Sequence, residues 1–467
     1  MRNKDDRLLK RIARLMKKNR ELMERNKQLN SQVEKYSREN QQLKQSIEEF
    51  QVLKDIKENQ GENDKPLRFN MVTVFFAEIC GFNKVSDRED SNKLMDQLDT
   101  VFYHFDKTVE KYNVQKVKTI GDTFMCAGGI PQKNSTNPVD VVIAAFEMLN
   151  FIKSLEEKID GEPVWNIKMG VHTGPVYAYV QGKRKVNYDV KGDTVNIASR
   201  LESTAEPGKI IISVMTYELV KEIFNCDYYG KMPVKYFGDM ELFTVSGIKP
   251  ELSIDKKGHF PNNLFRTKFA LIQFNDLQEM ILDKLERELP PDLFYHNVKH
   301  TVDVVTEVEL IGWSEGINDE ELLLLKTAAL FHDAGHTISY DDHEEFGCKM
   351  ACSYLPSFGY TTKQIDRICD IIMATKLPPK PTTLLEKIIC DSDLDYLGRS
   401  DFIPVSNTLF RELKVRNKID NINEWNKLQI KFISGHQYFT QTARSLREIN
   451  KQKQIERIKQ MLEETTD

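Results

Sequence analysis

The sequence predicts an α+β domain followed by an all-α domain, with a parallel coiled coil at the N-terminus. A heptad pattern of apolar residues without proline runs through residues 1–60. Runs rich in β-branched and aromatic residues alternate with helical stretches over residues 67–248, as is typical of α+β domains. From residue 264 to residue 467 nearly every segment has helical periodicity. A chain of 467 residues has room for roughly two to three domains, which agrees with this division.

Composition and charge exclude several classes of protein. The formal net charge of -5 and the sequence pI of about 6.1 provide no basic field for nucleic acid. The sequence has no run of about 18 apolar residues, which a membrane span needs, and its charged start lacks the apolar segment of a secretion signal. Seven cysteines without framework spacing fit reduced thiols better than disulfides. We therefore expect a cytoplasmic protein with no nucleic-acid partner and no transmembrane segment.

The coiled coil predicts a dimer. Its seam repeats in steps of three and four, with Ile12 at an a position and Leu15 at a d position. Asn19, Asn26 and Asn40 occupy further a positions, where each Asn can pair with its own copy across a parallel dimer. The seam consists of Ile12, Leu15, Leu22, Leu29, Val33, Tyr36, Leu43, Ile47 and Phe50. A solvated single helix is the alternative.

The first twenty residues carry nine Arg or Lys and two Asp. A basic amphipathic start can touch an anionic membrane surface. We favour a solvated flank of the coiled coil.

Two polar segments, 61–66 and 249–263, are predicted linkers because they are rich in Gly, Pro, Asn and Asp. Between them the pattern predicts, in order, a strand at 71–79, a helix at 90–112, a hairpin at 116–129, a helix at 138–155 and a strand pair at 165–180.

Four motifs in this region resemble the class III adenylate/guanylate cyclase catalytic domain over residues 68–248. They are FFAEICGF (75–82), KVKTIGDTFM (116–125), MGVHTGPV (169–176) and YDVKGDTVNIASRLE (188–202). The resemblance implies a ferredoxin-like core and in-line attack of the ribose 3'-oxygen on the α-phosphorus of a nucleoside triphosphate. Two Mg²⁺ or Mn²⁺ ions and fixed cations would stabilise the developing charge.

The resemblance also implies the residues of this site. Glu78 and Asp122 take the positions of the metal carboxylates, and the backbone carbonyl of Ile79 is the third ligand. Asn196 would orient the ribose, and Arg200, four residues later on the same helix face, would stabilise the transferring phosphate. The alternative without a functional role is that Arg200 is a solvated helix residue and Asn196 a residue that favours a turn.

The resemblance places Lys118 and Asp189 at the two positions that read the base. A Lys donates to N1 of adenine and an Asp accepts from the 6-amino group, whereas guanine reverses both requirements. The guanylate pattern of the family carries Glu, and often Cys, at these positions. The substrate is therefore expected to be ATP, and the product 3',5'-cyclic AMP.

Two positions depart from the family pattern. Glu78 stands where Asp is usual, which moves the carboxylate by about 1.5 Å, and a misplacement of about 1 Å can cost on the order of a hundredfold in rate. Phe237 stands where the family has a Lys that binds the triphosphate, and Lys235, on a presumed strand, is a candidate substitute. The alternative function is a nucleotide-binding pseudocyclase or scaffold dimer whose only chemistry belongs to the C-terminal domain.

In the family, the metal carboxylates and the Asn/Arg pair of one site come from different subunits. This chain carries both sets, so the resemblance implies a homodimer with two equivalent sites, in agreement with the predicted coiled coil.

The C-terminal motifs YHNVKHTVDVV (295–305), ALFHDAGHT (329–337) and IICDSDLDYLG (389–398) resemble the HD phosphohydrolase superfamily over residues 264–467. The resemblance implies a divalent transition metal that activates water toward phosphorus. Its ligands would be His300, His332, Asp333 and either Asp393 or Asp391; His296 would be a general acid, and His336 and His343 could extend the site to a second metal.

The HD substrate stays open among cyclic nucleotides, other nucleotides and alarmones. The HD domain is expected to act as a metal-dependent phosphohydrolase or phosphodiesterase in cyclic-nucleotide signalling. Cys348 and Cys352 share a helix face but make only half a zinc site, so we expect them to be buried small residues.

Overall fold

The computed structural model describes residues 66–80, 91–155, 158–159, 162–163, 165–181, 187–235 and 238–464. The chain divides into two units, Met1–Pro66 and Leu67–Asp467. The predicted coiled coil at 1–60 and Phe237 lie outside the described residues. Among the helices described, none combines the length and apolar character that a membrane span requires.

The N-terminal part of the second unit is built on an eight-stranded sheet with the order β2-β3-β1-β6-β8-β10-β9, in which β7 also pairs with β6. The pairs are antiparallel except for β6 and β8, which are parallel. The strands are β1 (Leu67–Cys80), β2 (Gln115–Ile120), β3 (Thr123–Gly128), β6 (Asn166–Gln181), β7 (Asn187–Lys191), β8 (Ile210–Ser213), β9 (Phe224–Val234) and β10 (Gly238–Ile248). A separate two-residue pair is formed by β4 (Lys158–Ile159) and β5 (Glu162–Pro163).

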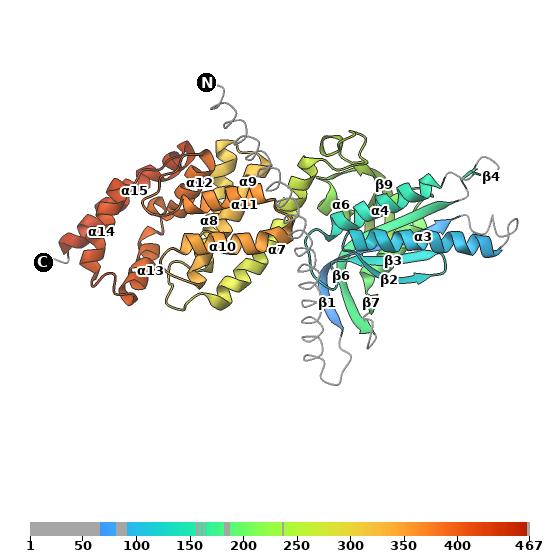
Figure 1. Cartoon of the computed structure of the whole chain (residues 1–467), viewed down its shortest axis with the longest axis horizontal. Coiled ribbons are helices and arrows are strands. Elements are labelled where there is room, and N and C mark those ends of the chain that lie inside the picture. Colours follow the sequence, from blue (N-terminus) through green and yellow to red (C-terminus); the bar gives the residue numbers. More distant parts are fainter. Residues whose placement is uncertain are drawn as a thin grey trace, which may run out of the picture. The chain divides into compact units, whose positions relative to one another are not determined.

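Helices cover both faces of this sheet because β1 is apolar on both sides. Phe75 and Ala77 point into a core with α3 (Ser91–Lys111), α4 (Asn137–Ser154) and α6 (Val214–Val220). Val74 and Phe76 face the other side, where Ala198 of α5 (Asp193–Thr204) packs. Figure 1 shows α3 and α4 running together across the strands. The helices predicted at 90–112 and 138–155 and the hairpin predicted at 116–129 are present, whereas the strand pair expected at 165–180 is one strand, β6.

The C-terminal part is helical, as predicted. Several of its helices begin at side-chain caps: Asn297 accepts the amide N–H of His300, and Asn318, Thr361 and Thr383 form capping boxes. The helices are α7 (Asn263–Glu288), α8 (Val298–Glu315), α9 (Asp319–Phe331), α10 (His343–Tyr354), α11 (Thr362–Met373), α12 (Leu384–Asp393), α13 (Phe402–Val415), α14 (Ile422–Gly435) and α15 (Gln441–Glu464). Short 3-10 turns are η1 (Pro250–Leu252), η2 (Ala334–Thr337), η3 (Leu355–Phe358) and η4 (Asp395–Gly398).

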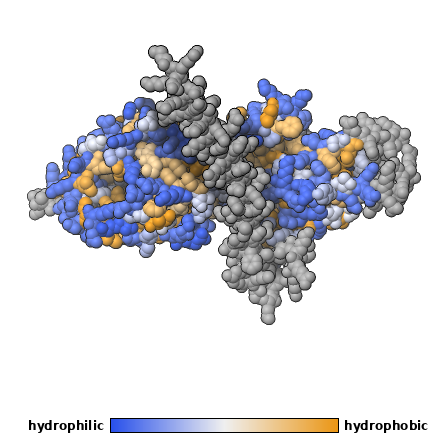
Figure 2. All heavy atoms as spheres, in the orientation of Figure 1, coloured by the Kyte–Doolittle hydropathy of each residue, from blue (hydrophilic) through white to orange (hydrophobic). Residues whose placement is uncertain are grey.

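Helix α7 contributes to two hydrophobic cores. Phe265 belongs to the core of the sheet domain, whereas Phe274, Leu277 and Ile281 belong to the helical core with α8, α9 and α11. Asp276 of the same helix accepts hydrogen bonds from the amide and the hydroxyl of Ser135, at 2.9 Å and 2.7 Å. On the face shown in Figure 2, hydrophilic side chains surround smaller apolar areas.

Candidate active sites

The β2–β3 hairpin brings two carboxylates to one end of the sheet. Glu78 pairs with Thr123 across β1 and β3, directly beside the two-residue turn of Gly121 and Asp122. Gly121 has a φ of 63°, which suits the tight turn. The amide N–H of Ile79 donates to the carbonyl of Asp122 at 3.0 Å and fixes the turn against β1. The three expected metal positions are thus neighbours.

Two further charged side chains surround Glu78. Lys168 Nζ of β6 lies 3.7 Å from Glu78 Oε2. Glu202, on α5, is buried next to Glu78, and one of its oxygens has no hydrogen-bond partner among the described residues. Burial, followed by the hydrogen bond with Glu78, raises the pKa of Glu202 to about 7. Sequence reasoning missed both neighbours. An oxygen-rich donor set of this kind fits Mg²⁺ or Mn²⁺.

Asn196 and Arg200 are exposed on α5, as expected for residues that reach a nucleotide. The helix lies tightly on β6: a Cβ on Gly170 would come within 2.1 Å of the amide of Glu202, so only glycine fits there. Asn196, Arg200 and Lys235 line one cavity of about 400 Å³. Lys235 lies one residue beyond the end of β9, in a turn, which corrects its expected position on a strand.

Lys118 and Asp189 meet across the sheet. Lys118 Nζ is 3.3 Å from Asp189 Oδ1, although the two residues are 71 positions apart in the sequence. Lys191 Nζ lies 3.5 Å from the other oxygen of Asp189. The two expected base-reading residues are therefore adjacent, one a donor and one an acceptor.

The helical domain gathers a cluster of histidines and aspartates from several segments of the chain. His300 is in the first turn of α8, and His332 and Asp333 follow α9. His343 begins α10 and Asp393 ends α12. A Cβ on Gly335 would lie 1.9 Å from the carbonyl of His343, so this glycine is needed for η2 and α10 to meet.

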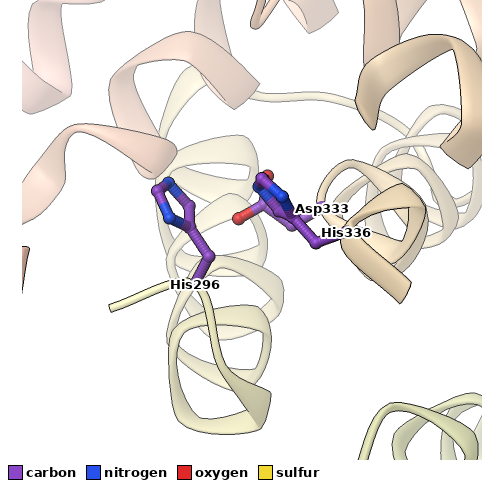
Figure 3. Close-up of side chains that lie close together, drawn as sticks. All are labelled: His296, Asp333 and His336. Carbon is purple, nitrogen blue, oxygen red and sulfur yellow. The ribbon is translucent and has the colours of Figure 1, made fainter. Parts of the chain in front are cut away.

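The cluster forms two triads. Within each triad, the three nitrogen or oxygen atoms that could bind a metal lie within 4.8 Å of one another. One is His300, His332 and Asp393; the other is His296, Asp333 and His336, which Figure 3 shows. Asp333 connects them, because its Oδ2 lies 3.4 Å from His300 Nε2 and 3.3 Å from His332 Nε2. His343 Nε2 is 3.5 Å from Asp333 Oδ1.

The chemistry of this cluster fits a metal. His332 Nε2, Asp333 Oδ2 and both ring nitrogens of His336 are buried and have no hydrogen-bond partner among the described residues. His332 Nδ1 lies 2.7 Å from the carbonyl of Ala329, so that nitrogen carries the proton and Nε2 is directed inward as a ligand. Imidazole and carboxylate ligands together suit a divalent transition metal.

Asp391 does not join the cluster. Its two oxygens accept hydrogen bonds from the amides of Phe439 and Thr440, at 2.8 Å and 2.7 Å, just before α15. The geometry therefore favours Asp393 as the ligand and leaves Asp391 with a structural role. Cys352 is exposed, which corrects the expectation of two buried cysteines; Cys348 is half-buried.

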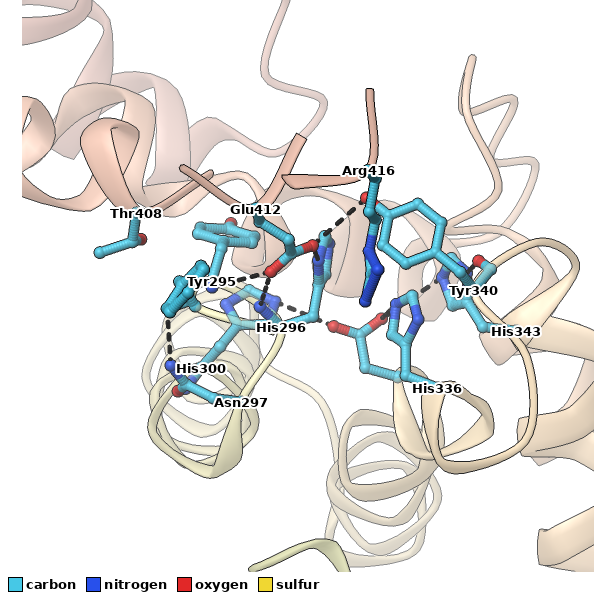
Figure 4. Close-up of polar contacts among 12 residues, drawn as sticks. Tyr295, His296, Asn297, His300, His336, Tyr340, His343, Thr408, Glu412 and Arg416 are labelled. Atoms are coloured by element: carbon cyan, nitrogen blue, oxygen red, sulfur yellow. Dashed lines mark hydrogen bonds and ion pairs between the residues drawn. The ribbon is translucent and has the colours of Figure 1, made fainter. Parts of the chain in front are cut away.

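Sequence reasoning missed Glu412 of α13, which is fully buried. Its Oε1 lies 2.5 Å from His296 Nδ1, and Oε2 accepts from the amides of Tyr295 and His296 (Figure 4). Tyr340 donates its hydroxyl to Oε1 at 3.2 Å. Burial lowers the pKa of His296, but the hydrogen bond to Glu412 and the negative charges of Asp333, Glu412 and Asp393 together outweigh it, and the pKa is raised. No spacing signal links two residues 116 positions apart.

Comparison with known proteins matches these two parts of the chain to two families. The model of the "Adenylate and Guanylate cyclase catalytic domain" matches residues 65–247, and that of the "HD domain" matches residues 297–395. Guanylyl cyclase C of Homo sapiens is 34% identical over 192 residues, which are 40% of this chain and 18% of that protein. This chain thus spans about a fifth of the length of that relative.

Two solved structures align with the first part. The guanylate cyclase domain of RhGC from Catenaria anguillulae, in complex with GTP, is 34% identical, covers 39% of this chain and 100% of its own, and has a TM-score of 0.36. The adenylyl cyclase CyaB from P. aeruginosa is 30% identical, covers 39% of this chain and 95% of its own, and also has a TM-score of 0.36. By the two family models, residues 65–247 of this chain belong to the class III adenylate and guanylate cyclase catalytic domains, and residues 297–395 belong to the HD domains.

Proposed function

We propose that this chain is an adenylate cyclase that converts ATP to 3',5'-cyclic AMP and pyrophosphate as a homodimer. We propose further that its HD domain is a metal-dependent phosphohydrolase of cyclic-nucleotide signalling. The observation that carries the cyclase proposal is the presence on one chain of two separate half-sites. In the part of the chain that the structure describes, the cavity with Asn196 and Arg200 is lined by residues of α5, β9 and the turn after it. Glu78 and Asp122 lie elsewhere, at the hairpin.

A second chain would therefore complete each site. Asn196 would orient the ribose, and Arg200 would stabilise charge on the α-phosphate with its planar fork. Lys235 lines the same cavity and is the candidate cation for the triphosphate. Glu78, Asp122 and the Ile79 carbonyl would hold two Mg²⁺ or Mn²⁺ ions, which supply charge stabilisation to the attacking and leaving oxygens when bound.

The choice of ATP rests on Lys118 and Asp189. Lys118 supplies a donor for adenine N1 and Asp189 an acceptor for the 6-amino group. GTP would meet the opposite pattern at both positions. Because guanylyl cyclases are among the relatives of this domain, any assay should include GTP.

For the HD domain, His300, His332, Asp333 and Asp393 would hold the metal, which activates water toward phosphorus when bound. His296, hydrogen-bonded to Glu412, would donate a proton to the leaving oxygen. The full enclosure of Glu412 keeps this histidine in one orientation.

One observation favours the alternative of a pseudocyclase. Lys168 Nζ lies 3.7 Å from Glu78 and places a cation of the protein beside an expected metal ligand. If this contact persisted with nucleotide bound, the cyclase fold would bind ATP without turnover and only the HD domain would be catalytic.

The test is a time course of cyclic nucleotide production by the purified full-length protein with ATP or GTP and Mn²⁺. We expect cyclic AMP from ATP, little product from GTP, and loss of product in Arg200→Ala. The same assay with His332→Ala/Asp333→Ala detects synthesis that rapid hydrolysis would hide. If that double variant, and Glu78→Asp within it, also made nothing, the pseudocyclase would replace the cyclase. Production of cyclic GMP instead would overturn the base assignment.

A further inference from the structure

A cavity of about 290 Å³ adjoins the HD metal cluster. His300 and Asp393 of the cluster are among the residues that line it, so a molecule whose phosphoryl group is held at the cluster could place its remaining part in this cavity. The rings of Tyr295 and Tyr396 also line it, with their centroids 5.3 Å apart, and give it aromatic surface. The volume is at the small end for ligand sites.

The charged lining of this cavity is mostly acidic. Besides Asp393, four carboxylates line it, and the only cations among the described lining residues are Lys299 and Arg399. The four carboxylates belong to Asp303, Glu307, Asp395 and Asp401.

Both cations are already paired. Arg399 forms a two-point contact with Asp401, Nε to Oδ1 at 2.9 Å and Nη2 to Oδ2 at 2.6 Å, and its Nη1 donates to Asp303 at 3.2 Å. Lys299 Nζ donates to the same Asp303 oxygen at 2.7 Å. Arg447, which is not among the lining residues, donates from Nε to Asp395 Oδ1 at 2.5 Å, and its Nη2 lies 3.6 Å from Glu307.

A second phosphate in this cavity would therefore face carboxylates without a cation to neutralise it. Phosphate recognition in proteins uses Arg forks and Lys charges that are open to the ligand. Here the guanidinium of Arg399 is already bound to Asp401, and the carboxylates that line the cavity repel anionic ligands.

We propose that this cavity makes the HD domain selective for molecules whose only phosphoryl group is the one at the metal cluster, with an uncharged nucleoside in the cavity, and that Asp401 and Asp303 determine this selectivity. Cyclic and linear nucleoside monophosphates belong to this class, and nucleoside polyphosphates, alarmones among them, do not. The inference rests on the proposed hydrolytic function of the HD domain and narrows its substrate class.

The experiment uses full-length Arg200→Ala protein, so that the cyclase does not consume nucleotide, at saturating free Mn²⁺. Hydrolysis of bis-p-nitrophenyl phosphate, which has no base, reports the chemistry, and AMP and ATP are added as competitors. We expect ATP to inhibit at least about tenfold more weakly than AMP. Cyclic AMP as substrate separates a cyclic from a linear monophosphate.

The variant Asp401→Asn opens the fork of Arg399. We expect it to strengthen ATP inhibition by roughly tenfold and to leave AMP inhibition nearly unchanged, with an effect that shrinks at high salt. Asp303→Asn is the second variant. Glu309→Gln is the matched control, because Glu309 is on the same helix as Asp303 but pairs with Lys326 at 2.6 Å, outside the cavity.

Equal inhibition by AMP and ATP in the Arg200→Ala protein, or an unchanged ATP constant in both Asp variants, would overturn the selectivity proposal. Absence of any metal-dependent hydrolysis would instead overturn the proposed HD activity. In that case calorimetry of AMP and of ATP with the Mn²⁺-loaded Arg200→Ala protein still decides the selectivity. The same titrations of this protein with His332→Ala/Asp333→Ala added are subtracted, because that variant keeps the cyclase site, and the remaining binding should show the same difference between the two nucleotides.

Discussion

The two candidate centres differ in how much of each is enclosed by the chain. In the cyclase domain Asn196 and Arg200 are exposed, and Lys118 is 45% exposed. In the HD domain the side chains of His332 and Asp333 are 1% and 9% exposed, and several nitrogen and oxygen atoms of the cluster are buried with no hydrogen-bond partner among the described residues. A centre with exposed functional groups needs something further to enclose the substrate, whereas the HD cluster is assembled before any ligand binds. We therefore expect the activity of the cyclase centre to depend on assembly with a second chain, and that of the HD centre to depend on a bound metal.

The strongest test of this contrast is complementation between inactive cyclase variants. Asp122→Ala and Arg200→Ala alone should each lower cyclic AMP production by roughly 10² to 10³-fold, since each removes a group that stabilises transition-state charge. In a homodimer with shared sites, co-expression of the two should restore about a quarter of the original activity, because half of randomly mixed dimers carry one intact site.

The matched control is Arg200→Ala mixed with Asn196→Ala. Both changes fall in the same half-site, so no mixed dimer regains an intact site. Restoration in this control, or none in the first mixture, would mean that the sites are not built from two chains.

A smaller effect is expected from Glu412→Gln in the HD domain. Loss of the charged partner of His296 should lower kcat by roughly 10 to 100-fold with little change in KM. Glu412 raises the pKa of His296, and the general acid must be protonated, so the loss of this charge should shift the high-pH limb of kcat to lower pH.

Hydrolysis of bis-p-nitrophenyl phosphate across pH measures this effect. Tyr340→Phe is the control, because it removes only the 3.2 Å contact to the same carboxylate and should have a weaker effect. A pH profile that keeps its position while the rate falls would assign Glu412 a purely structural role.

The smallest effect concerns the contact between the two domains. Ser135→Ala removes the 2.7 Å hydroxyl bond to Asp276 and should cost about 1 kcal/mol, which corresponds to roughly fivefold faster hydrogen exchange in α7. Ser154→Ala is the control, since that hydroxyl bonds to Phe151 within the sheet domain. Unchanged exchange in α7 would indicate that the two domains are not coupled by this contact.

The sequence predicted most of the fold because local patterns carry it: β-branched and aromatic runs for the strands, and helical periodicity for the helices. The members of the two triads were named as site residues because they occur in short motifs, although His296 was expected as a general acid and its grouping with Asp333 and His336 was not foreseen. Glu412 was missed because it lies on a distant helix with no motif of its own. Glu202 is the last residue of the motif at 188–202, but its contact with Glu78 depends on how closely α5 packs on β6, and the spacing of residues in the sequence does not reveal that packing.

Helix α7 has a consequence for how this chain can be divided. Phe265 completes the interior of the sheet domain, and Leu277 and Ile281 complete that of the helical domain, on one uninterrupted helix. A cut placed before α7 would open the first interior, and a cut placed after it would open the second. If either domain were transferred to another protein, α7 would have to be transferred with it, because each core needs residues of this helix. The unit that can be exchanged is therefore larger than either domain alone.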